Sequence, residues 1–197
     1  KTKIKVSIGK NFNTPNEKAV YDYLYCFEKV VGVADLVSIN ISSPNTKELF
    51  HLQFEKRLPS LLNALKESQL KHSKEYGYKP LIIKISPDLS NEDLNAIALN
   101  LTKFKIDGLI ATNTSVEHDH KLGKGGLSGK RLYKKSTETL KFMRKKLGKD
   151  FPIIASGGVM DRDSYKKKLD SGADLVQIYT GLIFYGPELI QDIFNSD

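Results

Sequence analysis

The sequence predicts an α/β protein in which short parallel strands alternate with amphipathic helices. Three observations predict this class. Six apolar runs recur along the 197-residue chain. Their apolar content is nearly continuous, as in parallel strands that are covered on both faces. Between them lie longer segments in which apolar residues recur at helical spacing.

Each predicted strand is followed by polar residues or by glycine. The expected strands are Ile4–Ile8, Asp35–Ile41, Leu81–Ile85, Gly108–Thr112, Ile153–Ser156 and Leu175–Ile178. The residues that follow them are, in the same order, Gly9, Ser42-Ser43, Ser86, Asn113, Gly157-Gly158 and Thr180. The carboxyl ends of the strands are therefore where we expect ligands to bind.

The predicted helices carry several start and stop signals. They are expected at about Asn16–Val30, Phe54–Glu75, Asn91–Lys103, Lys134–Leu147, Asp161–Ser171 and Pro187–Phe194. Ser90 stands before the third helix, and Asp161 is suited to cap the fifth. Gly172 stands just past the end of the fifth helix, where a left-handed residue is wanted.

Repeated β-α units form either an open doubly wound sheet or a closed barrel. No Gly-x-Gly-x-x-Gly turn follows the first strand, as a dinucleotide fold would want, and a barrel gathers all its polar strand ends at one active face. We therefore expect a (β/α)8 TIM barrel. Such barrels have eight strands, so the six seen here predict strands three to eight, with residues 1–197 forming one catalytic barrel that lacks its first two β-α units.

Composition excludes some functions. The chain is 40% hydrophobic and 27% charged, and no apolar run approaches the ~18 residues that span a bilayer. The net charge of +8 comes mostly from scattered lysines. The densest basic groups are Lys134-Lys135, Arg144-Lys145-Lys146 and Lys166-Lys167-Lys168. All fall in amphipathic helices, so we expect solvated outer faces and no nucleic-acid binding.

Cysteine and histidine offer no metal site. Cys26 is the single cysteine, which rules out an internal disulfide, and its aromatic neighbours predict a packed core thiol. The histidines are His51, His72, His118 and His120. We expect them in loops or on exposed helix, without a third ligand near the His118–His120 pair.

The richest polar stretch is Asn40-Ile-Ser-Ser-Pro-Asn-Thr46, directly after the second predicted strand. Its amides and hydroxyls suit a ligand rich in N–H and C=O groups. The alternative is a proline-initiated turn whose side chains cap their own backbone, and local sequence alone does not separate the two. Thr112-Asn113-Thr114 repeats the polar pattern after another strand.

Lys84 lies inside the apolar strand Leu81–Ile85. A charge in a buried strand is costly unless it is paired. It either faces an electron-rich cofactor ring in the barrel lumen or extends to a carboxylate. We favour the first interpretation.

Glycine pairs mark the last strand ends. Gly157-Gly158 follows the fifth predicted strand and Tyr179-Thr180-Gly181 the sixth, where barrels of this kind often bind phosphate. Gly125–Gly129 could close over the same ligand. The alternative for each is a turn that needs positive φ.

Together these motifs resemble a known family. They are Asn40–Thr46, Lys84-Ile-Ser-Pro-Asp-Leu89, Asp107-Gly-Leu-Ile-Ala-Thr-Asn-Thr114, Gly125-Gly-Leu-Ser-Gly129, Ile153-Ile-Ala-Ser-Gly-Gly158, Val176-Gln-Ile-Tyr-Thr180 and Phe184-Tyr-Gly-Pro187. In this order they resemble class 2, quinone-dependent dihydroorotate dehydrogenase over nearly the whole chain.

The resemblance implies an FMN enzyme of pyrimidine synthesis that oxidises dihydroorotate to orotate. Ser43 matches the catalytic base that removes the C5 proton while a hydride passes from C6 to flavin N5. The base needs help, from a water chain or Thr46. Lys84 matches the lysine beside flavin N1 and O2. The implied substrate contacts are Asn40, Asn45, Asn113 and Thr114. The other implied cofactor contacts are Asn40, Thr112, Ser128, Gly129, Gly157, Gly158, Tyr179 and Thr180.

The resemblance also implies partners and a location. These are a membrane quinone and peripheral contact with a membrane through an N-terminal segment that is absent here. The location would be the cytoplasmic face of the bacterial inner membrane, or the mitochondrial inner membrane in a eukaryote. The chain departs from the family at Ser7, where asparagine is common. The alternatives are a related FMN barrel acting on dihydropyrimidine or dihydrouridine, and a non-enzymatic basic binding protein.

Overall fold

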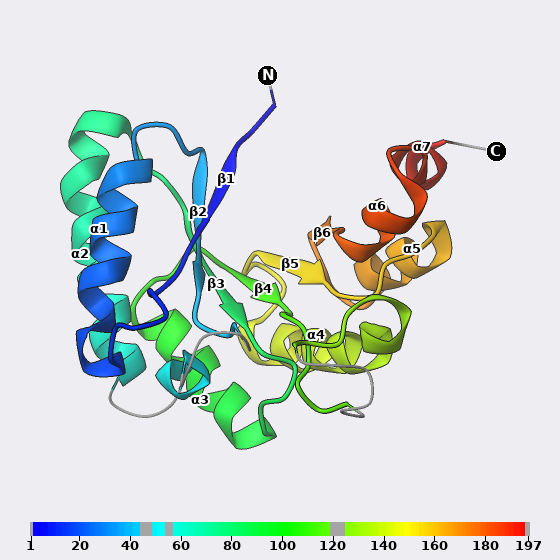
Figure 1. The fold of residues 1–197 in the computed structure, drawn as a ribbon, viewed down its shortest axis with the longest axis horizontal. Helices are drawn as coiled ribbons and strands as arrows, with labels where there is room; N and C mark the ends of the chain where they lie inside the picture. The colour runs from blue at the N-terminus through cyan, green and yellow to red at the C-terminus, as the bar shows by residue number, and fades with distance from the viewer. Residues whose placement is uncertain (1, 44–48, 54–56, 119–124, 196–197) are drawn as a thin grey trace. The chain divides into compact units, whose positions relative to one another are not determined.

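The structure, a computed structural model, describes residues 2–43, 49–53, 57–118 and 125–195. Its strands are β1 (Lys5–Ile8), β2 (Leu36–Asn40), β3 (Leu81–Ile85), β4 (Gly108–Ala111), β5 (Ile153–Ser156) and β6 (Leu175–Gln177). They follow one another in the sheet in chain order, and the pairs β1–β2, β2–β3 and β5–β6 are parallel (Figure 1). Parallel neighbours joined through helices confirm the predicted β-α repeat of a (β/α)8 barrel.

The helices fall close to the predicted segments. They are α1 (Ala19–Val30), α2 (Arg57–Tyr76), α3 (Asn91–Lys103), α4 (Tyr133–Leu147), α5 (Arg162–Asp170), α6 (Thr180–Tyr185) and α7 (Glu188–Phe194). Short 3-10 turns are η1 (Asn16–Lys18), η2 (Leu49–Gln53) and η4 (Gly129–Leu132). Helix α6 was not predicted, because six residues are too few to show helical periodicity.

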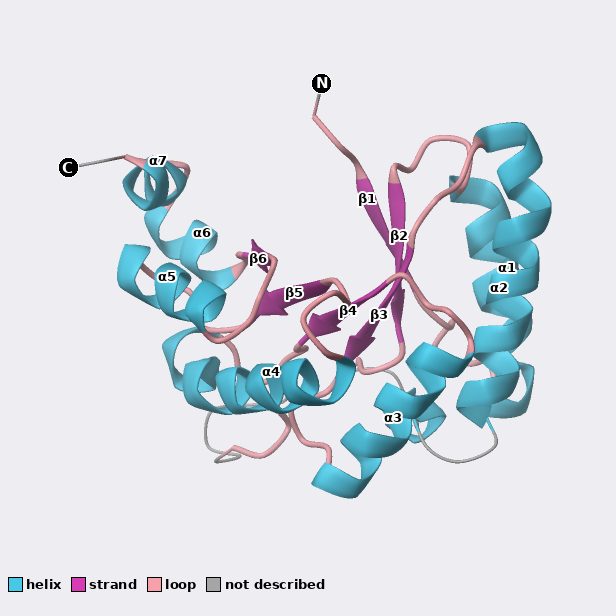
Figure 2. Cartoon of the chain, turned by 180° about the vertical axis from the view of Figure 1, so that it is seen from behind, coloured by secondary structure: helices cyan, strands magenta, loops and turns pink. Residues whose placement is uncertain are grey.

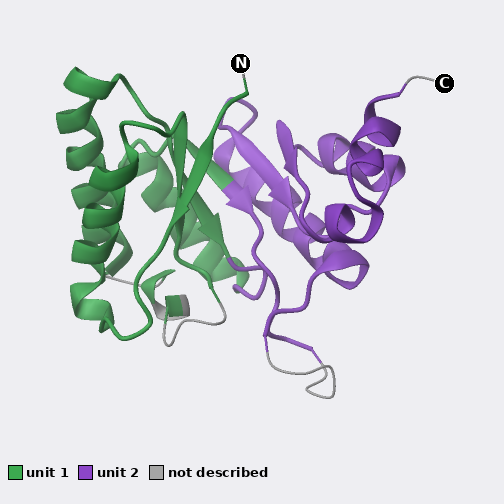
Figure 3. Ribbon diagram, turned by 45° about the horizontal axis from the view of Figure 1, so that its top comes forward, with its two compact units in different colours: residues 1–85, 90–109 green, residues 86–89, 110–197 purple. Residues whose placement is uncertain are grey.

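The chain divides into two compact units (Figure 3). Unit 1 holds residues 1–85 and 90–109, and unit 2 holds residues 86–89 and 110–197. In unit 1, α1 and α2 run side by side along β1–β3 (Figure 2). Their shared core is made of fully buried side chains: Tyr23, Phe27, Val37, Ile39, Leu62, Leu65, Leu81 and Ile83.

Strand alternation gives unit 1 a second, polar face. The registers pair Ser7 with Ser38 and Asn40 with Lys84, so these side chains lie on the face opposite Val37 and Ile39. We call Lys5, Ser7, Ser38, Asn40 and Lys84 the polar strand face. The apolar face of the sheet packs on the helices, so the polar strand face is the one that could bind a ligand.

Unit 2 is built around α4, which packs on β5, and around α5–α7. Val159, Leu189 and Ile193 form a small core that Tyr165 and Val176 extend. Leu132, Leu140, Met143, Ile153 and Ala155, on η4, α4 and β5, are buried in the same unit.

The predicted helix signals are confirmed. The Ser90 hydroxyl accepts from the Asp93 amide at 3.1 Å, and the Asp161 carboxylate accepts from the Ser164 amide at 2.7 Å. Both motifs are reciprocal capping boxes. Gly172 follows α5 with φ +101°, the left-handed conformation expected there.

Two predictions about side-chain surroundings are wrong. Lys168 of the expected solvated group is fully buried, because its helix face packs inward rather than toward water. Cys26 is only half-buried instead of lying in the core, since α1 turns its neighbours Tyr23 and Phe27 inward. Burial, followed by the charge of Asp22, raises the pKa of Cys26, so the thiolate is disfavoured.

Candidate functional site

The carboxyl ends of β2 and β3 are joined by side chains in unit 1. Ser42 donates through Oγ to the carbonyl of Lys84 at 2.8 Å, and its amide donates to Asn40 Oδ1 at 3.3 Å. The hydroxyl of Tyr23 donates to the Asn40 carbonyl at 2.7 Å. Burial raises the pKa of Tyr23, so its hydroxyl stays protonated and remains a donor. The polar stretch after β2 is thus fixed at its start, partly as the capped turn considered above.

Ser43 follows this fixed segment and is half-buried, so it is accessible to a small ligand. Asn45 and Thr46 lie outside the described residues. Of the predicted unit 1 residues, the structure therefore brings Asn40 and Lys84 together directly, as register partners on the polar strand face, with Ser43 three residues beyond Asn40.

Lys84 is the unusual group on this face. It is half-buried, and within the described part of the chain its ammonium makes no ion pair with a carboxylate. Burial lowers the pKa of Lys84, and the neighbouring positive charge of Lys5 lowers it further. A partly desolvated cation without an anionic partner favours an electron-rich or anionic ligand over the alternative of a carboxylate partner.

The polar turn after β4 is part of unit 2. The Thr112 amide donates to the Ser156 carbonyl at 2.9 Å, and the Thr114 amide donates to Asn113 Oδ1 at 2.9 Å. Thr112 and Asn113 are buried and Thr114 is half-buried. Thr112 Oγ1 also donates to the Asn113 carbonyl at 2.8 Å, so the side chains of Thr112 and Asn113 are both hydrogen-bonded within this turn.

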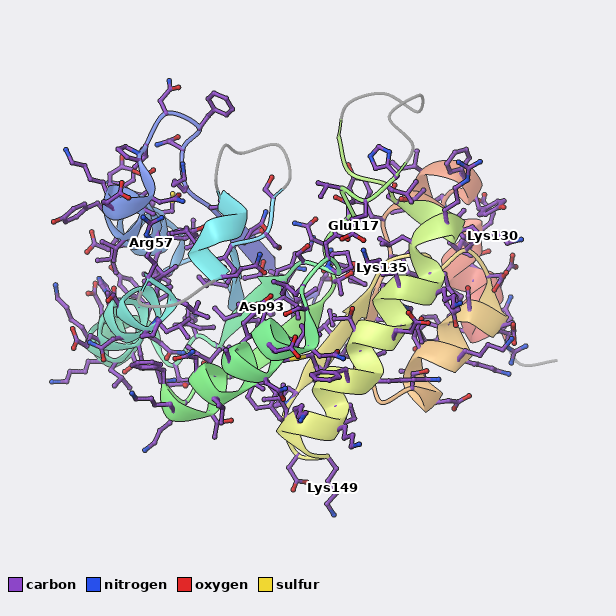
Figure 4. All side chains as sticks on the ribbon, turned by 90° about the horizontal axis from the view of Figure 1, so that it is seen from below. Arg57, Asp93, Glu117, Lys130, Lys135 and Lys149 are labelled. Carbon is purple, nitrogen blue, oxygen red and sulfur yellow. The ribbon has the colours of Figure 1, made fainter. Side chains whose placement is uncertain are left out.

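Asp88 secures the segment that follows this turn, and sequence reasoning missed it. Its carboxylate accepts from Ser115 Oγ at 2.5 Å, from the Val116 amide at 2.8 Å and from the Lys135 ammonium. Glu117 also pairs with Lys135, beside which it lies in Figure 4. Burial opposes the charge on Lys135, but hydrogen bonds to the two carboxylates outweigh it and raise the pKa of this lysine. Lys135 is thus a structural cation.

Ser115 also closes the loop between β4 and α4. It forms a two-way backbone bridge with Leu127, with N···O distances of 3.2 and 2.7 Å. This bridge brings the end of the loop, Ser128-Gly129, back toward the strand. Because the bridge is made of backbone atoms, no pattern of side chains predicts it.

Six predicted cofactor contacts lie in unit 2, and we call them the glycine cluster: Ser128, Gly129, Gly157, Gly158, Tyr179 and Thr180. Thr180 Oγ1 donates to Ser128 Oγ at 3.0 Å. A Cβ added to Gly129 would lie 3.1 Å from Thr180 Cγ2. Ser128-Gly129 and Thr180 therefore meet, although they are far apart in sequence, and Gly157-Gly158 pack on Leu132, Tyr133 and Ser136, which follow Gly129 closely along the chain.

No residue with a side chain fits at Gly157 or Gly158 in this backbone. Gly157 and Gly158 have φ values of +111° and +83°. A Cβ on Gly158 would lie 2.5 Å from Tyr133 Cα, and one on Gly157 would lie 3.0 Å from Ser136 Oγ. The turn therefore packs directly on the start of α4, and the positive-φ interpretation holds, while close approach of a phosphate to these glycines stays a prediction.

The remaining candidates are the histidines. Among described residues no group of three or more His, Cys, Asp or Glu side chains could hold a metal ion. His72 is half-buried on α2, where its ring packs edge-on against Phe27, and His118 bonds the Gly125 carbonyl at 2.8 Å. His120 and the side chain of His51 lie outside what the structure describes. Within the same ranges, no helix is long and apolar enough to cross a bilayer.

Comparison with known proteins agrees with the sequence motifs. The family model for dihydroorotate dehydrogenase matches residues 1–196. A protein of Aliivibrio salmonicida named dihydroorotate dehydrogenase (quinone) is 46% identical over 200 residues, covering 98% of this chain and 60% of that protein. A protein of the same name from Idiomarina loihiensis is 47% identical over 196 residues, covering 96% and 59%.

Solved structures give the same result. The crystal structure of the Eimeria tenella enzyme, titled DHODH in complex with ferulenol, matches with a TM-score of 0.89 at 33% identity. The match covers 95% of this chain and 55% of that one. The chain thus spans about 60% of the length of the curated relatives it matches. It belongs to the dihydroorotate dehydrogenase family, whose members are in general flavin-dependent, and within that family it is similar to the quinone-dependent class.

Proposed function

We propose that the protein oxidises dihydroorotate to orotate, with FMN as its cofactor and a quinone as the electron acceptor. The observation that carries the proposal is Lys84: a half-buried ammonium beside Asn40, with no carboxylate partner in the described part of the chain. An isoalloxazine ring, which gains electron density on reduction, is the kind of partner that such a cation stabilises.

The glycine cluster of unit 2 suits a phosphate, such as the phosphate of FMN. Its hydroxyls on Ser128 and Thr180 are 3.0 Å apart and point at each other, so both can turn toward an anion. The phosphate would bind the backbone of Gly157 and Gly158, whose Cβ positions are filled by Ser136 and Tyr133. Gly129 and Tyr179 complete the proposed phosphate contacts, and Thr112 supplies a further cofactor contact.

Lys84 would hold the ring of FMN, which would supply an acceptor for the hydride at C6 of dihydroorotate and a route for the electrons to the quinone. Ser43 would accept the proton from C5 through Oγ. Its own hydroxyl proton would leave toward a water chain or Thr46, since a serine is a poor base at its free pKa. The two steps together remove one proton and one hydride, which leaves the C5–C6 double bond of orotate.

The amides would orient the substrate. Asn40 and Asn113 can each donate and accept, as the N–H and C=O edges of a pyrimidine require. Thr114 would add a hydroxyl, and Asn45 a further amide. Because Ser42 and Tyr23 hold the backbone around Asn40, this side chain is positioned before any ligand arrives.

The quinone and membrane parts of the proposal follow from the relatives, which are named for quinone. We propose a peripheral location on the cytoplasmic face of the bacterial inner membrane, or on the mitochondrial inner membrane in a eukaryote. The contact would be made by a segment upstream of the residues described.

The test uses the full chain, purified without added flavin. We expect a yellow protein whose flavin absorption is perturbed by orotate, bleached by dihydroorotate without oxygen, and restored by a soluble quinone analogue. Bleaching by dihydrouridine or dihydropyrimidine but not by dihydroorotate would instead support a related flavin barrel. Absence of flavin together with salt-sensitive RNA binding would support a basic binding protein.

A further inference from the structure

Lys168 of α5 is a buried lysine that the proposed reaction does not use. Its side chain is 0% exposed, its ammonium donates to Ser136 Oγ at 2.7 Å, and it lies 4.9 Å from the centre of the Tyr133 ring. Within the described residues no carboxylate forms an ion pair with it. Among the described residues, the groups that compensate this charge are one hydroxyl and one aromatic face.

Both of those groups lead to the glycine cluster. Ser136 Oγ accepts from Lys168 and donates to the Gly157 carbonyl at 2.9 Å. Tyr133, whose ring covers the ammonium, is the residue on which Gly158 packs. The buried charge therefore stands two hydrogen bonds behind the Gly157–Gly158 turn.

A charged ammonium in this buried position lowers the stability of the fold. Removing a charge from water costs several kcal/mol even after the protein relaxes, unless an opposite charge or several hydrogen bonds offset the loss. Burial lowers the pKa of Lys168 to about 8, close to neutrality. A fold that needed only to fill this space could do so with an apolar side chain at no such cost.

We propose that Lys168 is a positioning residue for the cofactor phosphate: through Ser136 it fixes the Gly157–Gly158 turn, and its charge lies behind that turn to favour an anion in front of it. The inference rests on the proposed function, since it takes the phosphate of FMN as the anion. The phosphate in turn offsets the cost of the buried ammonium.

FMN and riboflavin separate this role from simple packing, because riboflavin has the same ring system without the phosphate. The experiment measures the affinity of the flavin-free full chain for each compound by quenching of flavin fluorescence. Lys168→Met keeps the aliphatic stem and removes the charge. The matched control is Lys167→Met, which removes the same charge from the next residue, where the side chain is 59% exposed and paired with Asp163.

We expect Lys168→Met to weaken FMN binding roughly 10-fold or more while riboflavin binding stays within about twofold, as for loss of a poorly screened charge interaction. Lys167→Met should change neither affinity. Equal weakening of both flavins by Lys168→Met would show a structural role and overturn the inference, as would unchanged FMN binding.

A second variant covers the case in which Lys168→Met does not fold. Ser136→Ala keeps the lysine and removes the link to Gly157, and we expect it to lower the FMN-to-riboflavin affinity ratio several-fold. An unchanged ratio in this variant overturns the inference. If the wild-type chain binds neither flavin, the proposed function fails and this inference fails with it, whereas tight FMN binding that is indifferent to both substitutions refutes the inference alone.

Discussion

The polar strand face of unit 1 is held by side chains, whereas the glycine cluster of unit 2 is held by backbone. Asn40, Ser42 and Tyr23 are fixed by hydrogen bonds around an ordinary strand end. Gly157 and Gly158 are fixed because no side chain fits where they pack. We therefore expect substitutions on the polar strand face to remove chemistry and spare the fold, and substitutions in the glycine cluster to damage the fold first.

Ser43→Ala should show the largest effect and the clearest loss of chemistry. Removing a proton acceptor costs roughly 10²- to 10⁴-fold in rate, so flavin reduction by dihydroorotate should slow by this factor while flavin stays bound. Stopped-flow absorption without oxygen measures the rate. Ser42→Ala is the neighbouring comparison: it loses the hydrogen bond to the Lys84 carbonyl and about 1 kcal/mol of stability, with a much smaller kinetic effect. Equal slowing in both variants would contradict the assignment of the base.

Gly158→Ala tests the other half of the comparison. The left-handed backbone costs an alanine about 1–2 kcal/mol, and the clash with Tyr133 adds ~1–3 kcal/mol, so the free energy of unfolding should fall by about 3 kcal/mol. Gly77→Ala is the matched control, with φ +73° and nothing within 4 Å of an added Cβ. It should cost only the backbone term. Urea denaturation followed by circular dichroism measures both, and equal losses would mean that packing on Tyr133 contributes nothing.

Lys84→Met should slow flavin reduction and raise the stability of the flavin-free protein. The pKa of Lys84 is lowered in the folded state by burial and by Lys5, so its charged form is disfavoured there at every pH below its unfolded pKa. Removing the charge should raise the stability of the flavin-free protein at pH 7 by on the order of 1 kcal/mol. The same variant should reduce flavin far more slowly. A variant that is less stable than wild type would show that Lys84 has a stabilising partner.

Asp161→Ala should give the smallest effect, with a definite pH dependence. Hydrogen bonds from the Ser164 backbone and side chain lower the pKa of Asp161, so its stabilisation of α5 is present above the unfolded pKa and is lost as pH falls through the folded one. The variant should lose about 1 kcal/mol at pH 7, and its difference from wild type should shrink below about pH 4. Asp161→Asn keeps a cap at both pH values and should stay near wild type. A pH-independent loss in the alanine variant would rule out the charged cap.

Much of unit 1 could be predicted from sequence because its signals are local. The bounds of β3 and α3 agree with the prediction, since a continuous apolar run and a capping box mark them in the sequence itself. Lys84 could be singled out for the same reason, as a charge inside an apolar run. Its lack of a carboxylate partner in the described residues could not, because that depends on which strands lie beside β3.

Unit 2 shows where sequence reasoning fails. Three adjacent lysines on α5 predicted a solvated face, yet the packing of α4 on that helix buries Lys168 and leaves Lys167 exposed. Asp88 is missed because its partners come from 27 to 47 residues away. The sequence singled out the glycines at the strand ends, but it could not show that Tyr133 is what excludes a side chain at Gly158.

The contact between Gly158 and Tyr133 also limits which substitutions the protein can accept as its sequence evolves. Every amino acid except glycine has a Cβ, and the space where that atom would go is occupied by backbone, which no change of a neighbouring side chain can vacate. A compensating second mutation would have to move α4 itself. The limits on the polar strand face are instead functional, because Asn40 and Lys84 are needed for the proposed chemistry, whereas at position 158 packing alone admits only glycine.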